Sequence, residues 1–276
     1  MNLKEALKDD LKPGELELVP RAFDIIGDIA LVEIPEELDG KEKLIAETIL
    51  KVHRNIRTVC RKMGVRSGEL RLRELKVLAG DGTETVHKEH GAMYMLDVRK
   101  AYFSPREATE RQRISEQVGP GETVLVMFSG IAPFAVMIAK QQPKVAKVYC
   151  IELNRDACKY AEDNIRVNKL GHKIVPVCGD VKEEARKLYG KCDRVVMPLP
   201  KEAHRFLPEA IRCLKKEGVI HFYHVAPEED MFTGAVKLAR DHCRKAGKKC
   251  KVLAKKKVLL YSPRNWKVCI DFKASG

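Results

Sequence analysis

The sequence lacks long apolar runs, closely spaced cysteine pairs and internal repeats. No hydrophobic stretch approaches the roughly 18 to 20 residues that cross a bilayer, and the first residues, MNLKEALKDDLKPGE, are too charged for a signal peptide. We therefore expect a cytoplasmic protein without membrane contact. The nine cysteines include no CxxC pair and are odd in number, which argues against zinc and against a disulfide framework. We expect no metal, and cysteines such as Cys150 and Cys269 to act as small core residues.

The composition is that of a globular protein with an excess of positive charge. The 276 residues are 45% hydrophobic and 33% charged, enough for one large or two modest domains with their own cores. Lysine and arginine number 52 against 39 acidic residues, a net charge of +13. This balance favours a polyanionic partner, by default a nucleic acid. The alternative is a protein that is simply basic.

The pattern of apolar residues changes near residue 113. Before it, short β-like runs at 23–34 and 84–98 bracket a helix-like stretch at 41–54, which predicts a small α+β domain at 1–113. After it, strand-like and helix-like segments alternate, which predicts βαβ units and a parallel sheet in a domain at 114–276. The last runs, KVLAKKKVLLYSP and NWKVCIDFKAS, predict an antiparallel hairpin. The expected fold class is therefore α/β, a Rossmann-like sheet ending in a hairpin, as in many S-adenosylmethionine-dependent methyltransferases.

A candidate cofactor loop follows the first strand of that sheet. The segment 127–134, MFSGIAPF, contains Phe128 and a single glycine, Gly130, where a dinucleotide fingerprint needs three, so NAD and FAD are disfavoured. The next strand ends in Glu152, 22 residues after Gly130, near the spacing at which a carboxylate meets ribose hydroxyls. The third strand ends before Asp180, which could accept a hydrogen bond from an adenine amine. Alone, each acid is more often a loop residue or helix cap; together they favour a bound adenosine moiety.

Several segments resemble one enzyme family. YFSPREATERQR, MFSGIAPF, NKLGHKIVP and VVMPLPKEAHRFLPEA, with RLRELKVLAG and TVHKEHG before them, are similar to the archaeal and eukaryotic tRNA guanine-37 N1-methyltransferases. The resemblance runs from about Phe23 to the C-terminal hairpin. It implies S-adenosylmethionine as cofactor, tRNA as partner and a class I methyltransferase fold. It also leads us to expect that a small N-terminal domain, which contacts the outer corner of tRNA in some members, is missing, and we favour a monomer.

The reaction itself limits which side chains can serve. Guanine N1 carries a proton at neutral pH, so its methylation needs a general base within hydrogen-bond reach and a donor at O6. By resemblance, Glu110 matches the base and Arg71 the residue at O6. The other matching positions are Tyr102 and Arg106 at the cofactor and target base, Arg111 at the RNA backbone or the catalytic loop, Glu152 and Asp180 at the ribose and adenine, and Pro200 at the wall of the methyl pocket. Without the resemblance, Glu110 would be read as part of a solvated helix start with ordinary charge pairs.

Three positions depart from the family pattern. Val126 replaces an acidic residue at the end of the first strand, Ala132 replaces the second glycine of the loop, and Pro198 in MPLP replaces an asparagine that helps to hold the target guanine. Proline offers neither a side-chain donor nor an N–H. Two alternatives therefore stay open: a wyosine-pathway transferase that moves the aminocarboxypropyl group of the same cofactor, and a non-catalytic tRNA-binding protein with a decayed cofactor site.

Basic residues gather at 54–73 and 240–257. Such clusters can hold phosphates on both sides of a flipped nucleotide, which predicts RNA contacts by Arg73, Lys248 and Lys249. The alternative is a solvated helix face, with lysines that protect the edge of a terminal hairpin.

Overall fold

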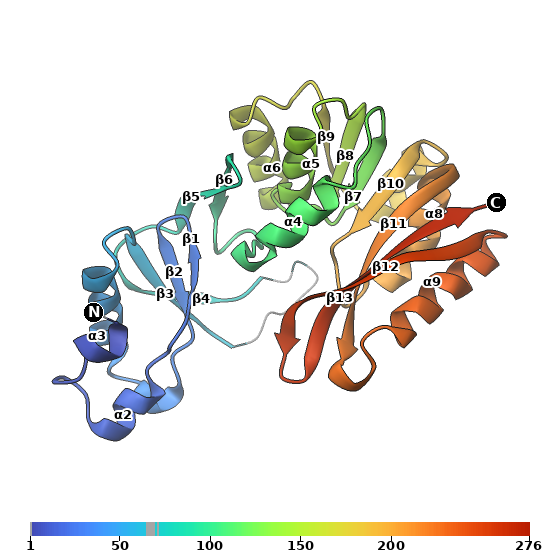
Figure 1. The fold of residues 1–276 in the computed structure, drawn as a ribbon. Helices are drawn as coiled ribbons and strands as arrows, with labels where there is room; N and C mark the ends of the chain where they lie inside the picture. The colour runs from blue at the N-terminus through green and yellow to red at the C-terminus, as the bar shows by residue number, and fades with distance from the viewer. Residues whose placement is uncertain (1, 65–69, 71) are drawn as a thin grey trace. The chain divides into compact units, whose positions relative to one another are not determined.

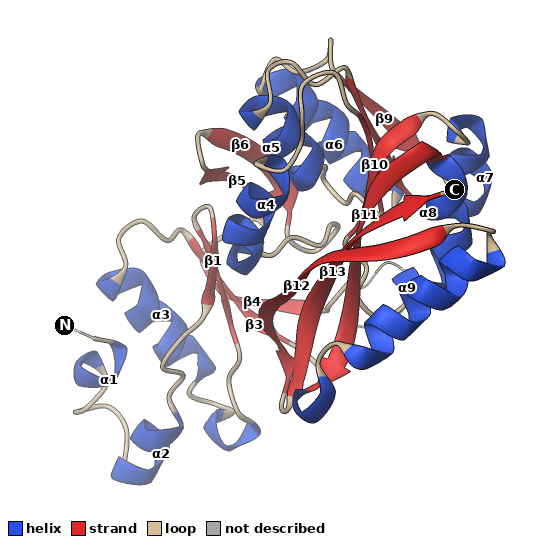
Figure 2. Ribbon diagram, turned by 45° about the vertical axis from the view of Figure 1, so that its right-hand side comes forward, coloured by secondary structure: helices blue, strands red, loops and turns tan. Residues whose placement is uncertain are grey.

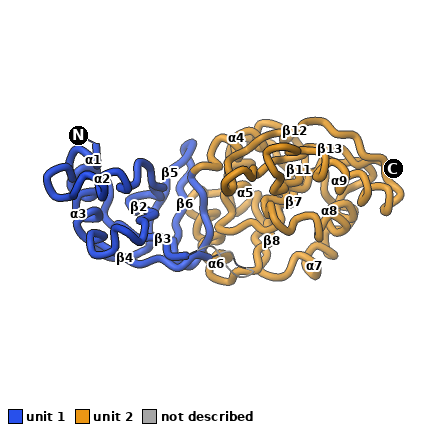
Figure 3. Tube along the Cα trace, turned by 90° about the horizontal axis from the view of Figure 1, so that it is seen from below, with its two compact units in different colours: residues 1–105 blue, residues 106–276 orange. Residues whose placement is uncertain are grey.

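The computed structural model describes residues 2–64, 70 and 72–276, and these divide into two compact units, 1–105 and 106–276 (Figure 3). The domain boundary expected from the sequence lay after residue 113. The two boundaries differ by residues 106–113, which include most of helix α4 (Ala108–Ser115). This helix belongs with the second unit because its Arg113 forms an ion pair with Asp271 near the end of the chain.

The first unit is α+β. Helix α3 packs its apolar stripe, with Ile45 and Ile49 one turn apart, on the core of a four-stranded sheet of order β1-β2-β3-β4. A separate hairpin, β5 and β6, completes the unit. The helices are α1 (Leu3–Ala6), α2 (Pro13–Leu18), η1 (Glu36–Leu38) and α3 (Glu42–Val52), and the strands are β1 (Asp24–Ile26), β2 (Ile29–Val32), β3 (Thr58–Lys62), β4 (Leu75–Ala79), β5 (Glu84–Glu89) and β6 (Ala92–Asp97).

The second unit is built on a seven-stranded sheet of order β12-β13-β11-β10-β7-β8-β9. Neighbouring strands from β11 to β9 are parallel, and β13 pairs antiparallel with both β11 and β12. The strands are β7 (Thr123–Met127), β8 (Lys147–Glu152), β9 (Ile174–Cys178), β10 (Cys192–Met197), β11 (Leu214–Pro227), β12 (Lys249–Ser262) and β13 (Asn265–Ser275). The α/β class with a C-terminal hairpin, expected from the alternating pattern, is confirmed.

Helices cover both faces of this sheet, as apolar parallel strands require. Helices α4, α5 and α6 lie on one face, and α7, α8 and α9 lie on the other (Figures 1 and 2). The remaining helices are η2 (Pro105–Glu107), α5 (Pro133–Gln141), α6 (Arg155–Val167), α7 (Val181–Glu184), η3 (Ala185–Leu188), η4 (Ala203–Phe206), α8 (Leu207–Cys213), η5 (Glu228–Asp230) and α9 (Thr233–Lys245). Among the described residues, no helix is long and apolar enough to cross a membrane.

One disulfide corrects the expectation drawn from the cysteine spacing. Cys158 on α6 and Cys178 at the end of β9 are bonded, with Cα atoms 5.8 Å apart. The pair was missed because helix packing, not sequence spacing, brings the two residues together. Cys150 and Cys269 are buried free thiols, as expected. Burial raises the pKa of the Cys150 thiol to about 12, so it stays protonated.

Candidate active site

The loop after β7 lies where the order of the parallel strands reverses, the position at which such sheets bind ligands. Three of its residues have left-handed backbones: Phe128 (φ 55°), Gly130 (φ 55°) and Ala132 (φ 66°). Gly130 adopts this conformation without cost, whereas the two residues that carry a Cβ are strained. Strained backbone of this kind persists where the surrounding structure holds it, often at functional sites.

Glu152 lies beside this loop, at the end of β8. The backbone N–H of Gly130 donates to Glu152 Oε2 at 2.6 Å, and the N–H of Asn154 donates to Oε1 at 2.8 Å. The sequence spacing had placed Gly130 and Glu152 together, and the structure does so. Burial raises the pKa of the Glu152 carboxyl, while these two backbone N–H groups oppose the shift. The result is a fixed carboxylate whose remaining lone pairs can accept hydrogen bonds from hydroxyl groups.

Asp180 follows β9, at the same edge of the sheet. Its carboxylate accepts a hydrogen bond from the backbone N–H of Lys182 at 2.8 Å and so caps α7. The residue is otherwise exposed. The alternative expected for this acid, a helix cap, is therefore present, and a contact with adenine stays a prediction.

Aromatic and proline residues flank this edge. Phe128 packs edge-to-face on Phe206, with ring centroids 4.8 Å apart. Pro200, buried after β10, accepts a hydrogen bond at its carbonyl from the N–H of Val225 at 3.1 Å. Pro198 lies two residues earlier and is half-buried. This PLP segment is therefore held by its backbone, and it presents no polar side chain.

Glu110 lies on α4 and is only 5% exposed. The interpretation of this segment as a solvated helix start is therefore wrong. Both carboxylate oxygens of Glu110 accept hydrogen bonds from the guanidinium of Arg113, each at 2.8 Å. The hydroxyl of Tyr223 also donates to Oε1, at 2.5 Å. Burial, with Cys269 and Glu110 nearby, raises the pKa of Tyr223, which stays a donor.

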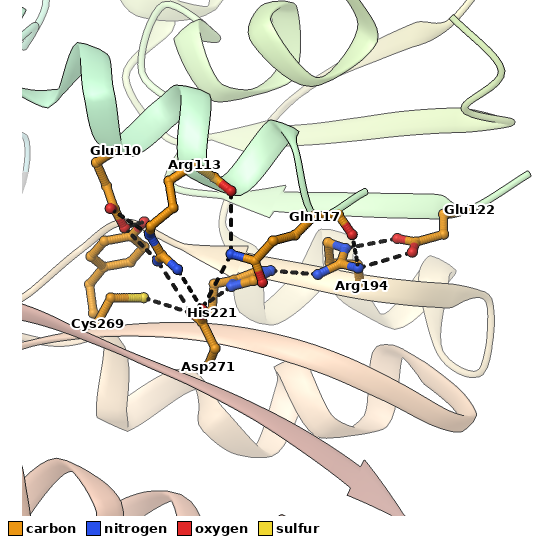
Figure 4. A network of polar contacts seen from close by, with 9 residues as sticks. Glu110, Arg113, Gln117, Glu122, Arg194, His221, Cys269 and Asp271 are labelled. Carbon is orange, nitrogen blue, oxygen red and sulfur yellow. Dashed lines mark hydrogen bonds and ion pairs between the residues drawn. The ribbon is translucent and has the colours of Figure 1, made fainter. Parts of the chain in front are cut away.

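These contacts continue as a chain of buried and half-buried polar groups (Figure 4). Arg113 Nη1 donates to Asp271 Oδ2 at 2.5 Å, and His221 Nδ1 lies 2.7 Å from Asp271 Oδ1. His221 Nε2 lies 2.7 Å from Arg194 Nη1, and Arg194 forms a bidentate pair with Glu122 at 2.8 and 2.9 Å. We call this set, from Glu110 to Glu122, the α4 network.

Sheet register explains how residues so far apart in the sequence meet. On the antiparallel strands β11 and β13, His221 pairs with Asp271 and Tyr223 with Cys269. Because side chains alternate along a strand, all four point to one face. Arg113, His221, Tyr223 and Asp271 were not singled out from the sequence. The available signal was the alternation of polar and apolar residues in IHFYHV and VCIDF.

The same cluster contains a set of possible metal ligands. The ligand atoms of His221, Cys269 and Asp271 lie within 4.8 Å of one another. Two guanidinium groups already contact this set, Arg113 at Asp271 and Arg194 at His221. Burial also raises the pKa of the Cys269 thiol, so no thiolate is offered. The local charge therefore disfavours a cation.

The two arginines that flank Glu110 differ in burial. Arg106 is exposed at the start of the second unit, while Arg111 is 2% exposed. A side chain so buried does not lie on the surface of the described structure, and a contact of Arg111 with the RNA backbone stays a prediction. The α4 segment is rich in charge but is covered by the sheet and by α5, so its sequence concealed this burial. The other expected role of Arg111, holding the catalytic loop, stays a prediction.

Two further candidate residues belong to the first unit. Tyr102 and Arg73 both line a pocket there, with Lys62, Ile26 and Phe103 among its other walls. Arg73 Nη1 donates to Glu33 at 2.9 Å. Arg71 lies outside the described residues.

In the basic segment 54–73, several of the residues that the structure describes are committed to ion pairs. Arg61 is buried and pairs with Asp39 and Glu42, and Lys62 pairs with Asp24 at 2.6 Å. These cations stabilise the first unit, so the part of this segment that is free for RNA is smaller than the sequence suggested. The described segment at 240–257 differs, because Lys249, Lys255 and Lys256 are exposed. Lys248 is half-buried, and its ammonium donates to the carbonyls of Lys215 and Lys216 at 3.4 and 3.0 Å.

Comparison with known proteins shows which family this chain is similar to. The family described as the TRM5/TYW2 methyltransferase domain matches residues 85–253, and the TYW2 N-terminal domain matches residues 3–83. The tRNA (guanine(37)-N(1))-methyltransferase Trm5b of Pyrococcus abyssi is 44% identical over 95% of this chain and 78% of its own length. The chain belongs to the TRM5/TYW2 family. The family resemblance expected from the sequence is confirmed.

Two further similar proteins show which reactions occur among the relatives of this chain. The solved complex of aTrm5 with tRNALeu has a TM-score of 0.87 and 36% identity, over 99% of this chain and 78% of that chain. The tRNA(Phe) (4-demethylwyosine(37)-C(7)) aminocarboxypropyltransferase of Pyrococcus horikoshii is 31% identical, over 98% of this chain and 95% of its own length. The family therefore includes both reactions that the sequence left open.

Proposed function

We propose that this chain transfers the methyl group of S-adenosylmethionine to N1 of guanine 37 in tRNA. The observation that carries this proposal is the 44% identity to a Trm5b enzyme over 95% of the chain. The geometry adds two elements in one unit: a carboxylate at the switch point of the sheet, and a buried carboxylate on α4. They match the two chemical needs of the reaction, a held nucleoside cofactor and a base.

The residues at the end of β8 suit an adenosine moiety. Glu152 is fixed by two backbone N–H groups and can accept from two vicinal hydroxyls. Asp180 would face the adenine, Phe128 and Pro200 would flank the cofactor, and Arg106 would pair with its carboxylate. When bound, the cofactor supplies an electrophilic methyl group on a sulfonium. The protein's part is to hold guanine N1 in line with that group and to exclude water.

Glu110 would remove the proton from guanine N1. A carboxylate that accepts hydrogen bonds from Arg113 and Tyr223 is oriented before substrate binds. Arg71 would donate to guanine O6, where negative charge develops, and Tyr102 would contact the base. Pro198 supplies no donor of its own, so we expect the base to be held by these other groups.

The direct test uses labelled cofactor and anticodon stem-loop transcripts. A transcript with guanine at position 37 should take up label, and one with adenine there should not. Mass spectrometry of the digested RNA should locate the methyl group on N1 of guanine 37. Equal labelling of both transcripts would exclude the proposal.

Aminocarboxypropyl transfer is the second candidate, favoured by the TYW2 N-terminal match over residues 3–83. The lower identity of the P. horikoshii enzyme, 31% against 44%, ranks it second. The small-molecule product separates the two reactions, because methyl transfer leaves S-adenosylhomocysteine and aminocarboxypropyl transfer leaves methylthioadenosine. A non-catalytic tRNA-binding protein would release neither product.

Contacts with tRNA would come from the exposed lysines at the start of β12 and from the first unit. Lys249 is exposed, and Lys248 and Arg73 are partly exposed. Phosphate contacts of this kind position an RNA without reading its sequence. A cytoplasmic location and a monomeric state remain predictions.

A further inference from the structure

Arg113 is shared between two buried carboxylates. Its Nε and Nη2 donate to Glu110 at 2.8 Å, while Nη1 donates to Asp271 at 2.5 Å. Glu110 is 5% and Asp271 1% exposed, so neither carboxylate is compensated by bulk water. The guanidinium charge is therefore divided between them. How much of it Glu110 receives depends on what else compensates Asp271.

Besides Arg113, His221 makes the shortest contact with Asp271, and its proton can be assigned from its neighbours. A guanidinium only donates, so Arg194 Nη1 at 2.7 Å requires His221 Nε2 to be an acceptor. The ring proton is then on Nδ1, which donates to Asp271 Oδ1 at 2.7 Å. Burial lowers the pKa of His221, which keeps the ring neutral. Glu122 forms a bidentate pair with Arg194 and so keeps the Arg194 guanidinium directed at His221 Nε2. This contact fixes the tautomer of His221.

We infer that Asp271 and His221 are positioning residues for Glu110: Asp271 draws part of the Arg113 charge away and so leaves the carboxylate able to accept a proton, while His221, by donating to Asp271, limits how much of that charge is drawn away. This inference rests on the proposed function, in which Glu110 takes the proton of guanine N1. If Arg113 served Glu110 alone, the ion pair would be tighter and the carboxylate a weaker base. If Arg113 were drawn wholly to Asp271, Glu110 would lose its orientation.

The other charged and titratable groups around Glu110 do not substitute for this division. From β11, Tyr223 donates to Glu110. From β13, Lys267 lies 4.7 Å from the centre of the Tyr223 ring, but its ammonium pairs with Glu107 of η2 at 2.7 Å. The pKa of Cys269, also on β13, is raised by burial. Tyr223 and Cys269 therefore stay protonated near neutral pH. Cys269 Sγ and Gln117 Nε2 also donate to Asp271, at 3.2 and 3.4 Å, but as neutral donors. Asp271 and His221 therefore remain as the pair that sets how Arg113 is shared.

The test is the pH profile of single-turnover methyl transfer to a guanine-37 transcript. The rate should fall on the acid side as the base takes up a proton. In Asp271→Asn the competing charge is gone, so Arg113 turns to Glu110. The acid limb should then move to lower pH by about one unit, with a lower plateau rate. A folded variant with a lower plateau but an unmoved limb would overturn the inference.

The matched control is Asp193→Asn on β10. Asp193 also accepts a backbone hydrogen bond, from Thr123 at 2.8 Å, and an ion pair, from Lys215 at 2.8 Å, but it lies outside the α4 network. The acid limb of the pH–rate profile of Asp193→Asn should stay at the wild-type pH. Thermal unfolding of both variants gives the loss of stability that each change causes, so a purely structural effect is measured separately.

A second pair of variants decides the question if Asp271→Asn does not fold. Asparagine at 221 can place its amide nitrogen near the Nδ1 position and keep the donor to Asp271, whereas glutamine reaches the Nε2 position and loses that donor. His221→Gln should leave Asp271 less compensated, draw Arg113 toward it and move the acid limb to higher pH. His221→Asn should leave the limb in place. If the acid limbs of His221→Gln and His221→Asn lie at the same pH, the inference is overturned.

Failure of the inference can be told from failure of the proposed function. If wild-type protein forms no N1-methylguanine at position 37, the proposed function fails. If it forms the product but none of the substitutions at 271 and 221 moves the acid limb, the function stands and the positioning role falls.

Discussion

The second unit carries two polar centres that are built in different ways. At the carboxyl ends of β7 and β8, where we propose that the cofactor binds and which we call the cofactor edge, Glu152 is held by the N–H groups of Gly130 and Asn154, which are 22 and 2 residues away. In the α4 network, Arg113 is held by Asp271, 158 residues away. The first centre comes from backbone groups in consecutive strand-to-helix loops. The second comes from side chains that meet only when the register of β11 and β13 is set.

The difference shows which centre tolerates change. Backbone N–H groups remain when a loop side chain is replaced, so the cofactor edge can absorb a departure such as Ala132. A buried network does not, because removing one partner leaves another charge or polar group uncompensated in a low dielectric. We therefore expect substitutions in the α4 network to affect catalysis, and those at the cofactor edge to affect ligand affinity.

The largest effect is expected from Glu110→Gln. Glutamine keeps the shape of the side chain but cannot take a proton, so the single-turnover rate should fall by about 10² to 10⁴ while tRNA affinity stays unchanged. Glu116→Gln, at the exposed end of the same helix, is the matched control and should leave the rate unaltered. An undiminished rate in Glu110→Gln would remove Glu110 as the base.

Glu152→Ala tests the cofactor edge. Loss of a hydrogen-bonding carboxylate should weaken S-adenosylmethionine binding by about 10- to 100-fold, measured by calorimetry. Glu162→Ala, an exposed position on α6, serves as control. If Glu152→Ala binds as tightly as wild type, the ribose contact is wrong.

The pH dependence of cofactor affinity sharpens this test. Burial raises the pKa of Glu152, so its carboxylate takes up a proton at a higher pH than an ordinary glutamate does. Acceptor capacity is complete above that pKa and is lost as the pH falls through it. Affinity should therefore decline on the acid side in wild type, and this decline should be absent in Glu152→Ala.

A smaller effect is expected from the exposed lysines of β12. The double substitution Lys249→Gln and Lys255→Gln should lower tRNA affinity about tenfold at low salt, and should reduce the salt slope by about 0.7 to 0.9 for each lost phosphate contact. Lys140→Gln with Lys144→Gln is the control, since these exposed lysines lie at the end of α5 and before β8, and β8 is separated from β12 by four strands of the sheet. If the salt dependence of tRNA affinity is the same in the two double variants, the β12 lysines do not contact the RNA.

The smallest effect concerns the strained loop. Ala132→Gly should stabilise the protein by up to about 1 kcal/mol, because glycine adopts a φ of 66° without the Cβ clash. Ala135→Gly, an equally buried position inside α5, should instead destabilise it. Thermal unfolding measures both changes. A lower melting temperature for Ala132→Gly would show that the alanine is not strained.

The cofactor edge could be predicted from the sequence because its signals are local. Each strand ends where an apolar run meets a glycine or an acid, and the ends of parallel strands meet at one edge, so Gly130, Glu152 and Asp180 could be grouped. The fold class followed from the same alternation. That Asp180 caps a helix depends on local geometry, and the sequence offered it only as an alternative.

The α4 network could not be predicted, because register across β11 and β13 is a property of the folded sheet. His221 and Asp271 stand in runs that indicate ordinary apolar strands. The burial of Glu110 and Arg111 could not be predicted either, because a charged helix looks solvated until the elements that cover it are known. The Cys158–Cys178 disulfide belongs to the same class, since only the packing of α6 on the sheet brings its two residues together.

The position of β13 has a consequence for synthesis of the protein. It is the last strand of the sheet to leave the ribosome, yet it lies between β11 and β12 and carries Asp271. A nascent chain can form the first unit and the five parallel strands while Arg113 still lacks one of its two carboxylates. The Arg113 pair is therefore completed only when the C-terminal hairpin docks along β11.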